Sequence, residues 1–199
     1  MTTTQKQVGE VVESSTDELL VQSYEVNVAP PLGTLVRAAQ GESMVIYGVV
    51  SSIDTTPIDS SRKPIARGQA AASIKQIYDE HPQLTELFST HFSVRVLGHA
   101  QSYATVHGLP PMPPEVHQLV YACDTGEMVH FTQSLSFLPL LLGDQSNQVS
   151  QEVVAAFLRQ AALARGEGGH EFLVRAGKQL VSLLRGDSVR LTTLLGRLG

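Results

Sequence analysis

Histidine is the residue type in this chain best suited to metal binding or acid–base chemistry, yet no two histidines have the His-x-x-x-His spacing of a helical metal site. Cys123 is the single cysteine, so a zinc site with several thiolates is not predicted. Histidines that are distant in sequence could still come together in the folded protein. They would then form a metal site, or an active site together with scattered aspartates. The histidines that would take part are His99, His107, His117 and His130.

Motifs for nucleotide binding and for nucleophilic catalysis are absent from the sequence. Residues 166–170 and 176–179 come nearest to a phosphate-binding loop, but neither follows a strand with the spacing and hydroxyl residue that such a loop needs. Gly-x-Ser-x-Gly does not occur, and Cys123 lacks an evident electropositive setting, which predicts a buried cysteine in a strand. The sequence therefore predicts no catalytic residue, no cofactor and no metal.

Charge is distributed unevenly along the chain. Residues 1–149 contain seven Lys or Arg and fifteen Asp or Glu, a net charge of −8, whereas residues 150–199 contain seven and four, a net charge of +3. The two regions are either two solvated surfaces or an acidic body with a basic end that faces an acidic partner or phosphates. A basic group in the loop 51–68 is either solvated or an anion site. The cations concerned are Arg159, Arg165, Arg175, Lys178, Arg185 and Arg190 at the end of the chain, and Arg62, Lys63 and Arg67 in the loop.

Composition indicates an ordinary globular protein. Of the 199 residues, 42% are hydrophobic and 17% are charged, which suits one domain with an appendage. The polar start of the chain lacks the apolar core of a secretion signal, so we expect a cytoplasmic location. The longest markedly apolar stretch, 137–142, is far shorter than the roughly 20 residues that cross a bilayer, so no transmembrane segment is predicted.

The elements that would position any site begin with short apolar runs separated by turn signals at nearly even spacing. The runs lie at 8–13, 19–25, 34–38 and 44–53, and further strands are predicted at 92–97 and 116–123. Residues 45–50 are apolar on both faces, which predicts a central strand. We expect an α+β fold in which residues 7–145 form a small, mainly antiparallel β-barrel.

Two interruptions separate these strands. Residues 70–88 have helical character, with Pro82 suited to a helix start, and we expect these inserted short helices to cover one end of the sheet. Residues 107–114 contain four prolines and predict an extended connection that either packs along the surface or serves as a ligand for an aromatic groove. Residues 124–127 read as a turn and 128–142 as a short apolar segment.

From Ser150 the hydrophobic period changes from two to 3.6, which predicts a C-terminal segment of three helices at 150–199. Ser150 is a candidate cap for the first helix, and Asp187 or Ser188 for the third. The periodicity leaves open whether these helices pack on the barrel, on a partner or on a membrane surface. The residues predicted to bind a partner are Leu191, Leu194, Leu195, Leu198, Arg190 and Arg197.

The predicted barrel resembles a known family through several short stretches. They are residues 8–12 (Val-Gly-Glu-Val-Val), 31–36 (Pro-Leu-Gly-Thr-Leu-Val), 47–50 (Tyr-Gly-Val-Val), 92–98 (Phe-Ser-Val-Arg-Val-Leu-Gly), the Pro-rich link 109–114 and 120–122 (Val-Tyr-Ala). This pattern resembles the HAS-barrel family, the barrel domain of HerA-type DNA-translocating ATPases, which is similar to the crown barrels of rotary ATP synthases. In those ATPases a nucleotide-binding motor follows the barrel, whereas here only the three-helix segment follows. The resemblance implies assembly side by side with other subunits and a docking face for a partner.

The function predicted from the sequence is that of a non-enzymatic protein–protein interaction module, an adaptor or assembly factor whose partner is another protein or a second copy of the chain. The alternative is a nucleic-acid-processing accessory protein related to HerA-type translocases, in which the C-terminal cations contact phosphates.

Overall fold

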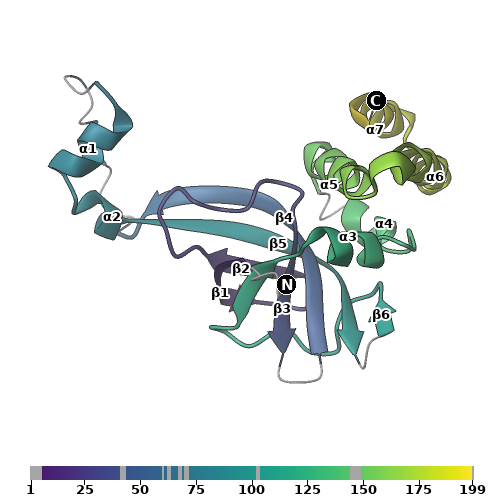
Figure 1. The fold of residues 1–199 in the computed structure, drawn as a ribbon, viewed down its shortest axis with the longest axis horizontal. Coiled ribbons are helices and arrows are strands. Elements are labelled where there is room, and N and C mark those ends of the chain that lie inside the picture. Colours follow the sequence, from purple (N-terminus) through teal and green to yellow (C-terminus); the bar gives the residue numbers. More distant parts are fainter. Residues whose placement is uncertain are drawn as a thin grey trace.

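The fold consists of a β-barrel with a helical layer at one end and a projecting hairpin at the other (Figure 1). The computed structural model describes residues 6–40, 44–59, 61, 64–66, 69, 72–101, 104–143 and 149–198. The basic loop residues Arg62, Lys63 and Arg67 lie outside this set. No helix among the described residues is long and apolar enough to cross a lipid bilayer.

Six antiparallel strands close the barrel. Around it they follow the order β2-β1-β7-β3-β4-β5, and β5 pairs again with β2, while β6 extends the sheet beyond β5. This arrangement confirms the predicted α+β fold with a mainly antiparallel barrel and the hairpin of the first two strands. The strands are β1 (Gln7–Ser14), β2 (Glu18–Gln22), β3 (Leu35–Gln40), β4 (Met44–Pro57), β5 (Phe88–Gln101), β6 (Ala104–Val106) and β7 (Leu119–Ala122).

Strand β4 is buried on both faces, as its sequence predicts. Ile46 and Val50 point into the barrel, where they pack with apolar residues of the other strands. Val49 points to the opposite side and joins a second core beneath the helices. Because side chains alternate along a strand, an apolar run without polar positions requires cover on both sides. The barrel interior and the helical layer provide it.

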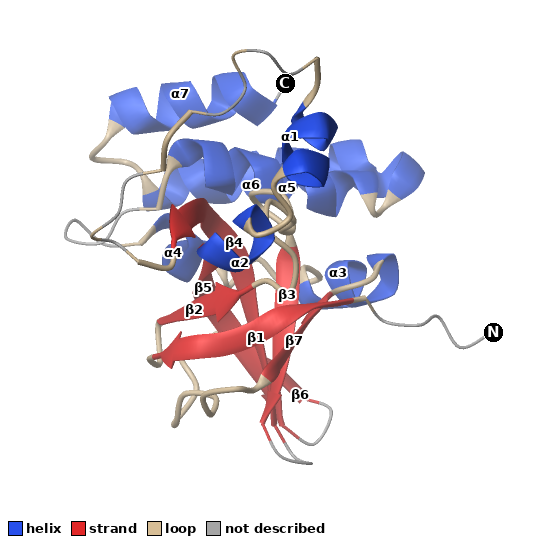
Figure 2. Ribbon diagram, turned by 90° about the vertical axis from the view of Figure 1, so that its left-hand side faces the viewer, coloured by secondary structure: helices blue, strands red, loops and turns tan. Residues whose placement is uncertain are grey.

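The helical layer covers the outer face of β3, β4 and β5 (Figure 2). Leu35, Val49 and Leu97 contribute the sheet side of this second core. A chain of aromatic contacts continues it, with Phe137 lying between Phe131 and Phe157 at centroid distances of 5.8 Å and 5.3 Å. The C-terminal helices therefore pack on the barrel. The helices of the layer are α3 (Thr125–Phe131), α4 (Leu138–Leu142), α5 (Gln151–Leu163), the 3-10 turn η1 (Gly166–Gly168), α6 (Gly169–Leu183) and α7 (Ser188–Leu198).

The predicted three-helix segment is confirmed, and two of its caps form. Ser150 Oγ accepts a hydrogen bond from Glu152 N at 3.3 Å, and Asp187 Oδ1 accepts one from Arg190 N at 3.0 Å. Each oxygen satisfies a backbone donor that has no partner within its own helix.

The turn predicted at residues 124–127 is wrong, because these residues cap and begin helix α3; the apolar segment 128–142 completes α3 and forms α4. Asp124 is the N-cap of α3, not part of a turn. Its Oδ1 accepts from Glu127 N at 2.8 Å, while Glu127 Oε2 accepts from Asp124 N at 3.1 Å. This reciprocal pair is a capping box, and the Asp-x-x-Glu spacing before an apolar run is its sequence signature.

The hairpin β4–β5 continues past the barrel as an arm. Strand β4 loses its β3 partner after Leu35↔Val49, and β5 loses its β2 partner after Gln22↔His91. Beyond that point β4 and β5 pair only with each other, from Thr55↔Thr90 to Pro57↔Phe88. The helices α1 (Ile74–Glu80) and α2 (Leu84–Leu87) lie at the far end of this arm, and neither contains a buried residue (Figure 1). The inserted helices therefore cap the arm rather than an end of the barrel sheet, because the two strands that carry them outrun the others.

The connection between β2 and β3 packs closely against α5 at Gly33. The φ of this residue is +80°, and a Cβ placed there would lie 2.6 Å from the backbone nitrogen of Phe157 in α5. Gly166 also has a positive φ, +55°, but a Cβ there would meet nothing within 4 Å.

We expect Gly33→Ala to lower the free energy of unfolding by about 2–4 kcal/mol, since it combines left-handed strain with overpacking against α5. Gly166→Ala should lower the free energy of unfolding by about 1 kcal/mol, because it adds only the strain of a left-handed backbone conformation. Urea denaturation of both variants measures the difference. Equal losses would show that the contact between Gly33 and α5 does not constrain the fold.

Candidate protein-interaction site

The leucines of α7 that were predicted to bind a partner lie against the protein's own core. Leu194 is completely buried, and Leu191 and Leu198 are partly buried against the same cluster. Leu195 remains 40% exposed. Because the leucine stripe already covers α5 and α6, only its edge at Leu195 faces outward.

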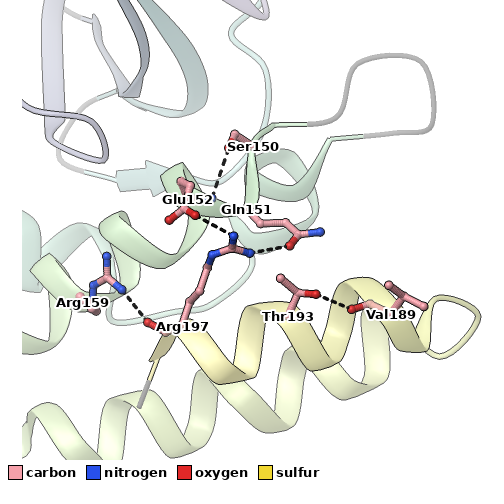
Figure 3. Close-up of polar contacts among 7 residues, drawn as sticks. All are labelled: Ser150, Gln151, Glu152, Arg159, Val189, Thr193 and Arg197. Atoms are coloured by element: carbon pink, nitrogen blue, oxygen red, sulfur yellow. Dashed lines mark hydrogen bonds and ion pairs between the residues drawn. The ribbon is translucent and has the colours of Figure 1, made fainter.

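The two arginines predicted with them are also engaged inside the protein. Arg190 is buried, and its Nη2 donates to the carbonyl oxygen of Leu142 at 2.6 Å, where α4 ends. Arg197 joins α7 to the start of α5, since its Nη1 donates to Gln151 Oε1 at 2.9 Å and its Nη2 lies 2.7 Å from Glu152 Oε1 (Figure 3). Leu194 and Arg190 are thus not available to a partner in this conformation.

Three of the six cations proposed for phosphate contacts are bound within the helical layer. Besides Arg190, Arg159 Nη1 donates to the carbonyl oxygen of Arg197 at 2.6 Å (Figure 3). Arg165 donates through Nη1 to Ala161 O and through Nη2 to Thr132 Oγ1, both at 2.6 Å, and its guanidinium lies 4.0 Å from the ring centroid of Phe172. These arginines therefore donate hydrogen bonds to carbonyl and hydroxyl oxygens at the ends of helices.

The other three cations form the outward face of the helical layer. Arg175, Lys178 and Arg185 are exposed, and none forms an ion pair or side-chain hydrogen bond with another described residue. Val174 and Val181 are exposed beside them, because positions 174, 178 and 181 fall on one stripe of α6. We call this the α6 face. It consists of Glu171, Val174, Arg175, Lys178, Val181 and Arg185, with Leu195 of α7 against Gly177 at its border.

The end of the arm is the second outward apolar surface. Ile58 is 65% exposed and Ile74 is 74% exposed, and Leu87 is exposed next to Ile58, whose backbone nitrogen donates to Leu87 O at 2.9 Å. The end of the arm is tied to the connection between β2 and β3, where Asn27 Nδ2 donates to Tyr78 Oη of α1 at 2.9 Å. Large apolar side chains on a supported projection, without cover from the same chain, are typical of interaction sites.

The histidines do not assemble into a metal site. His99, His107 and His130 lie around β6, but each bonds to a different group, and His117 pairs with Glu10 on the barrel. Among the described residues no three His, Cys, Asp or Glu side chains gather as a metal ion requires.

Two groups with acid–base potential stay protonated at neutral pH. Burial raises the pKa of the Cys123 thiol, and the nearby Glu127 carboxylate raises it further. Burial also raises the pKa of the Tyr47 phenol. A thiol in this state is a poor nucleophile. Cys123 follows β7 and is partly buried.

Burial lowers the pKa of His107 from its ordinary 6.5. The ring packs edge-on against Phe131, and Nε2 donates to the carbonyl oxygen of Phe131 at 2.9 Å. The folded state therefore prefers neutral His107, and the unfolded state takes up the proton more readily.

We expect acid to destabilise the wild type through this residue. The contribution of His107 to stability is complete above its ordinary pKa and is lost as pH falls through the lower pKa of the folded state. His107→Gln keeps an N–H donor without the titration, so its free energy of unfolding should change less between pH 7.5 and pH 5, values chosen to span the pKa of about 6.5. His170→Gln, at an exposed position, should behave as the wild type. Denaturant titrations at both pH values measure this, and the same pH dependence in all three proteins would contradict it.

Arg165 is predicted to act as a structural residue. Arg165→Ala removes a charged donor from Thr132 Oγ1 and Ala161 O, so we expect a loss of about 1.5–3 kcal/mol of unfolding free energy. Arg175→Ala, on the exposed side of α6, should change it by less than about 0.5 kcal/mol. Chemical denaturation distinguishes these outcomes, and a neutral Arg165→Ala would refute the assignment.

The sequence matches no protein-family model and no curated protein. The HAS-barrel resemblance thus rests on the stretches that suggested it and stays a prediction.

Proposed function

We propose that this protein is a non-enzymatic interaction module, an adaptor or assembly factor that works in the cytoplasm. The observation that carries the proposal is the arm, which presents Ile58, Ile74 and Leu87 to solvent at the end of two strands that are anchored in the barrel. An isolated exposed apolar residue is ordinary, but a group of them on one projecting element leaves apolar area that a partner would cover.

The rigidity of the arm's support favours a binding role. Strands β4 and β5 both continue from the barrel core into the arm, with the register of their pairing shifted at Tyr47/Gly48 and Val50/Ser52, and the side chains of Thr55 and Thr90 join across the arm at 2.8 Å. Asn27 N also donates to Thr90 Oγ1 at 2.7 Å, which ties the arm to the connection before β3. A site on regular, supported strands loses little conformational entropy on binding.

The resemblance to HAS barrels supports the same proposal, because such barrels assemble with other subunits.

The alternative, a nucleic-acid-processing accessory protein, would have to rely on Arg175, Lys178 and Arg185. If these three cations each contact one phosphate, the logarithm of the binding constant would fall with the logarithm of salt concentration with a slope of about −3. The Val174 and Val181 side chains between these cations fit a protein partner better than a phosphate backbone.

Substitution at the arm should weaken partner binding. Ile74 is the first residue of α1, where aspartate favours the helix, so Ile74→Asp removes the apolar group without harming the fold. We expect this variant, as tagged full-length protein in a lysate of the source organism, to recover the main partner in amounts reduced roughly tenfold or more relative to wild type. Quantitative mass spectrometry of the recovered proteins gives the measurement.

Val189→Asp is the matched control, since Val189 is equally exposed and also lies in the first turn of a helix, α7. It should recover partners as the wild type does. If the wild type recovers nothing above background, or if Ile74→Asp recovers the same proteins in the same amounts, the proposed function is wrong.

A further inference from the structure

The outer edge of strand β4 loses its neighbour where the arm leaves the barrel. Val50 holds the last two backbone hydrogen bonds on this side, since its N–H donates to Thr34 O at 3.0 Å and its carbonyl oxygen accepts from Gly33 N at 2.9 Å. From Ser52 to Pro57, the strand partner of β4 is β5. No described residue forms a backbone hydrogen bond with the opposite edge of this stretch.

The direction of each backbone group in this stretch follows from the hydrogen bond at its end. Ile58 N donates at 2.9 Å to the carbonyl oxygen of Leu87, which directly precedes β5, so the backbone groups of Ile58 point toward that strand. Because backbone groups alternate between the two edges of a strand, the residues that point to the open edge are Ile53, Thr55 and Pro57. Thr90 agrees with this assignment, since its carbonyl oxygen accepts from Ser23 N on the far side of β5 and not from Thr55 opposite it.

The open edge is therefore a short row of free donors and acceptors. Ile53 and Thr55 each present an N–H and a C=O group, whereas Pro57 presents only a C=O group, as is usual for a proline on an edge strand. Ile53 is 39% exposed and residues 54–56 are also exposed, so the row is accessible. Another extended chain matches such a row along its whole length, whereas a helix uses its backbone groups internally.

The sequence of this edge is complementary to that of a second copy. The open stretch runs from Val50, where the connection before β3 covers β4, to Pro57, where β4 ends, and Thr55 is the middle one of its three outward residues. A two-fold axis at Thr55 places this residue opposite its own counterpart and Ile53 opposite Pro57 of the second copy. The two Thr55 residues then exchange both backbone hydrogen bonds, and each Pro57 carbonyl accepts from Ile53 N–H. Every N–H group of the row thus finds an acceptor.

The same register tolerates the two residues that would otherwise protect this edge. Charged side chains and prolines discourage the pairing of exposed strands. With the axis at Thr55, however, Asp54 lies opposite Thr56 of the second copy, so no like charges meet and the threonine hydroxyl has a carboxylate to donate to. Pro57 lies at the end of the paired stretch, where only its carbonyl oxygen is needed.

We infer that the outer edge of β4 in the arm pairs with the same edge of a second copy, antiparallel and about a two-fold axis at Thr55. The arm projects away from the barrel (Figure 1), so the two arms form one ribbon in the order β5-β4-β4-β5 with a barrel beyond each end. A ribbon of this width is more stable than an isolated two-stranded one. Because both copies use the same surface, the assembly stops at a dimer. This inference rests on the proposed function, in which the arm is the interaction surface, and names a second copy as a partner.

Cysteine cross-linking of the full-length protein tests the register. Opposite residues in a hydrogen-bonded antiparallel pair have Cα atoms about 5.5 Å apart, which a disulfide can span. We therefore expect Thr55→Cys to form a disulfide-linked dimer under mild oxidation with diamide, as seen by non-reducing electrophoresis. Ile53→Cys is the matched control, because in this register the two copies of residue 53 lie about 14 Å apart along the strands. Equal cross-linking of the two variants, or none in either, overturns the inference.

Sedimentation velocity over a range of protein concentrations measures the dimer itself. We expect the wild type to pass from monomer to dimer as its concentration rises. Thr55→Pro removes the outward N–H group from each copy, so the dissociation constant of the dimer should rise about tenfold or more. Thr55→Val loses the same hydroxyl group but keeps the N–H group, and it should associate as the wild type does. Circular dichroism shows whether each variant is folded, and if Thr55→Pro is not, the cross-linking result decides.

The outcomes also separate this inference from the proposed function. A wild type that stays monomeric at every concentration, or a folded Thr55→Pro that dimerises as well as Thr55→Val, overturns the pairing of β4. Recovery of an Ile74-dependent partner from the lysate is measured independently. If that partner is a different protein and the wild type is a monomer, the interaction role of the arm stands without the dimer.

Discussion

The structure depends on two adjacent strands, β4 and β5, being covered on both faces. Inside the barrel their alternate residues meet β1, β2, β3 and β7, and outside it the intervening residues meet the helical layer. Val49 and Val50 show the division, because neighbouring residues of one strand belong to two different cores. Neither core could be removed without exposing a continuous apolar strand to water. The barrel and the helices are therefore joined through one shared sheet.

The same two strands explain why the molecule is elongated. They pair with each other for longer than with any neighbour, so they emerge from the barrel as a two-stranded ribbon. An isolated ribbon is only marginally stable, but this one continues from a buried sheet and is held by Asn27, Thr55 and Thr90. These polar contacts lie near the outer end of the ribbon and leave its apolar residues Ile58, Ile74 and Leu87 exposed.

Much of the fold follows from local sequence patterns. The period-two runs located the strands, the two-sided apolar run 45–50 located the central strand, and the change to a period of 3.6 at Ser150 located the three last helices. Asp124 was misread because its Asp-Thr-Gly-Glu segment suits both a turn and a capping box, and only the apolar residues that follow decide between them.

The candidate site was less predictable, for a physical reason. Periodicity shows which leucines of α7 share a face, but it does not show what covers that face, and here the cover is α5 and α6. The charge excess at the end of the chain likewise does not show that Arg159, Arg165 and Arg190 are used at helix ends. Ile58 and Ile74 became candidates only when the relative lengths of the strands were known, and no short motif encodes that length.

Closure of the barrel also sets an order of events during synthesis. The first strand finds its outer neighbour in β7, and Ser14 Oγ reaches Pro114 O across a separation of 100 residues. A chain that leaves the ribosome amino end first therefore carries the β1–β2 hairpin with no second neighbour until most of the sheet has been made. Contacts between residues this far apart in sequence slow folding and prolong the exposure of unpaired strand edges. The nascent chain thus exposes more apolar surface than the folded protein does, and a chaperone could bind that surface during synthesis.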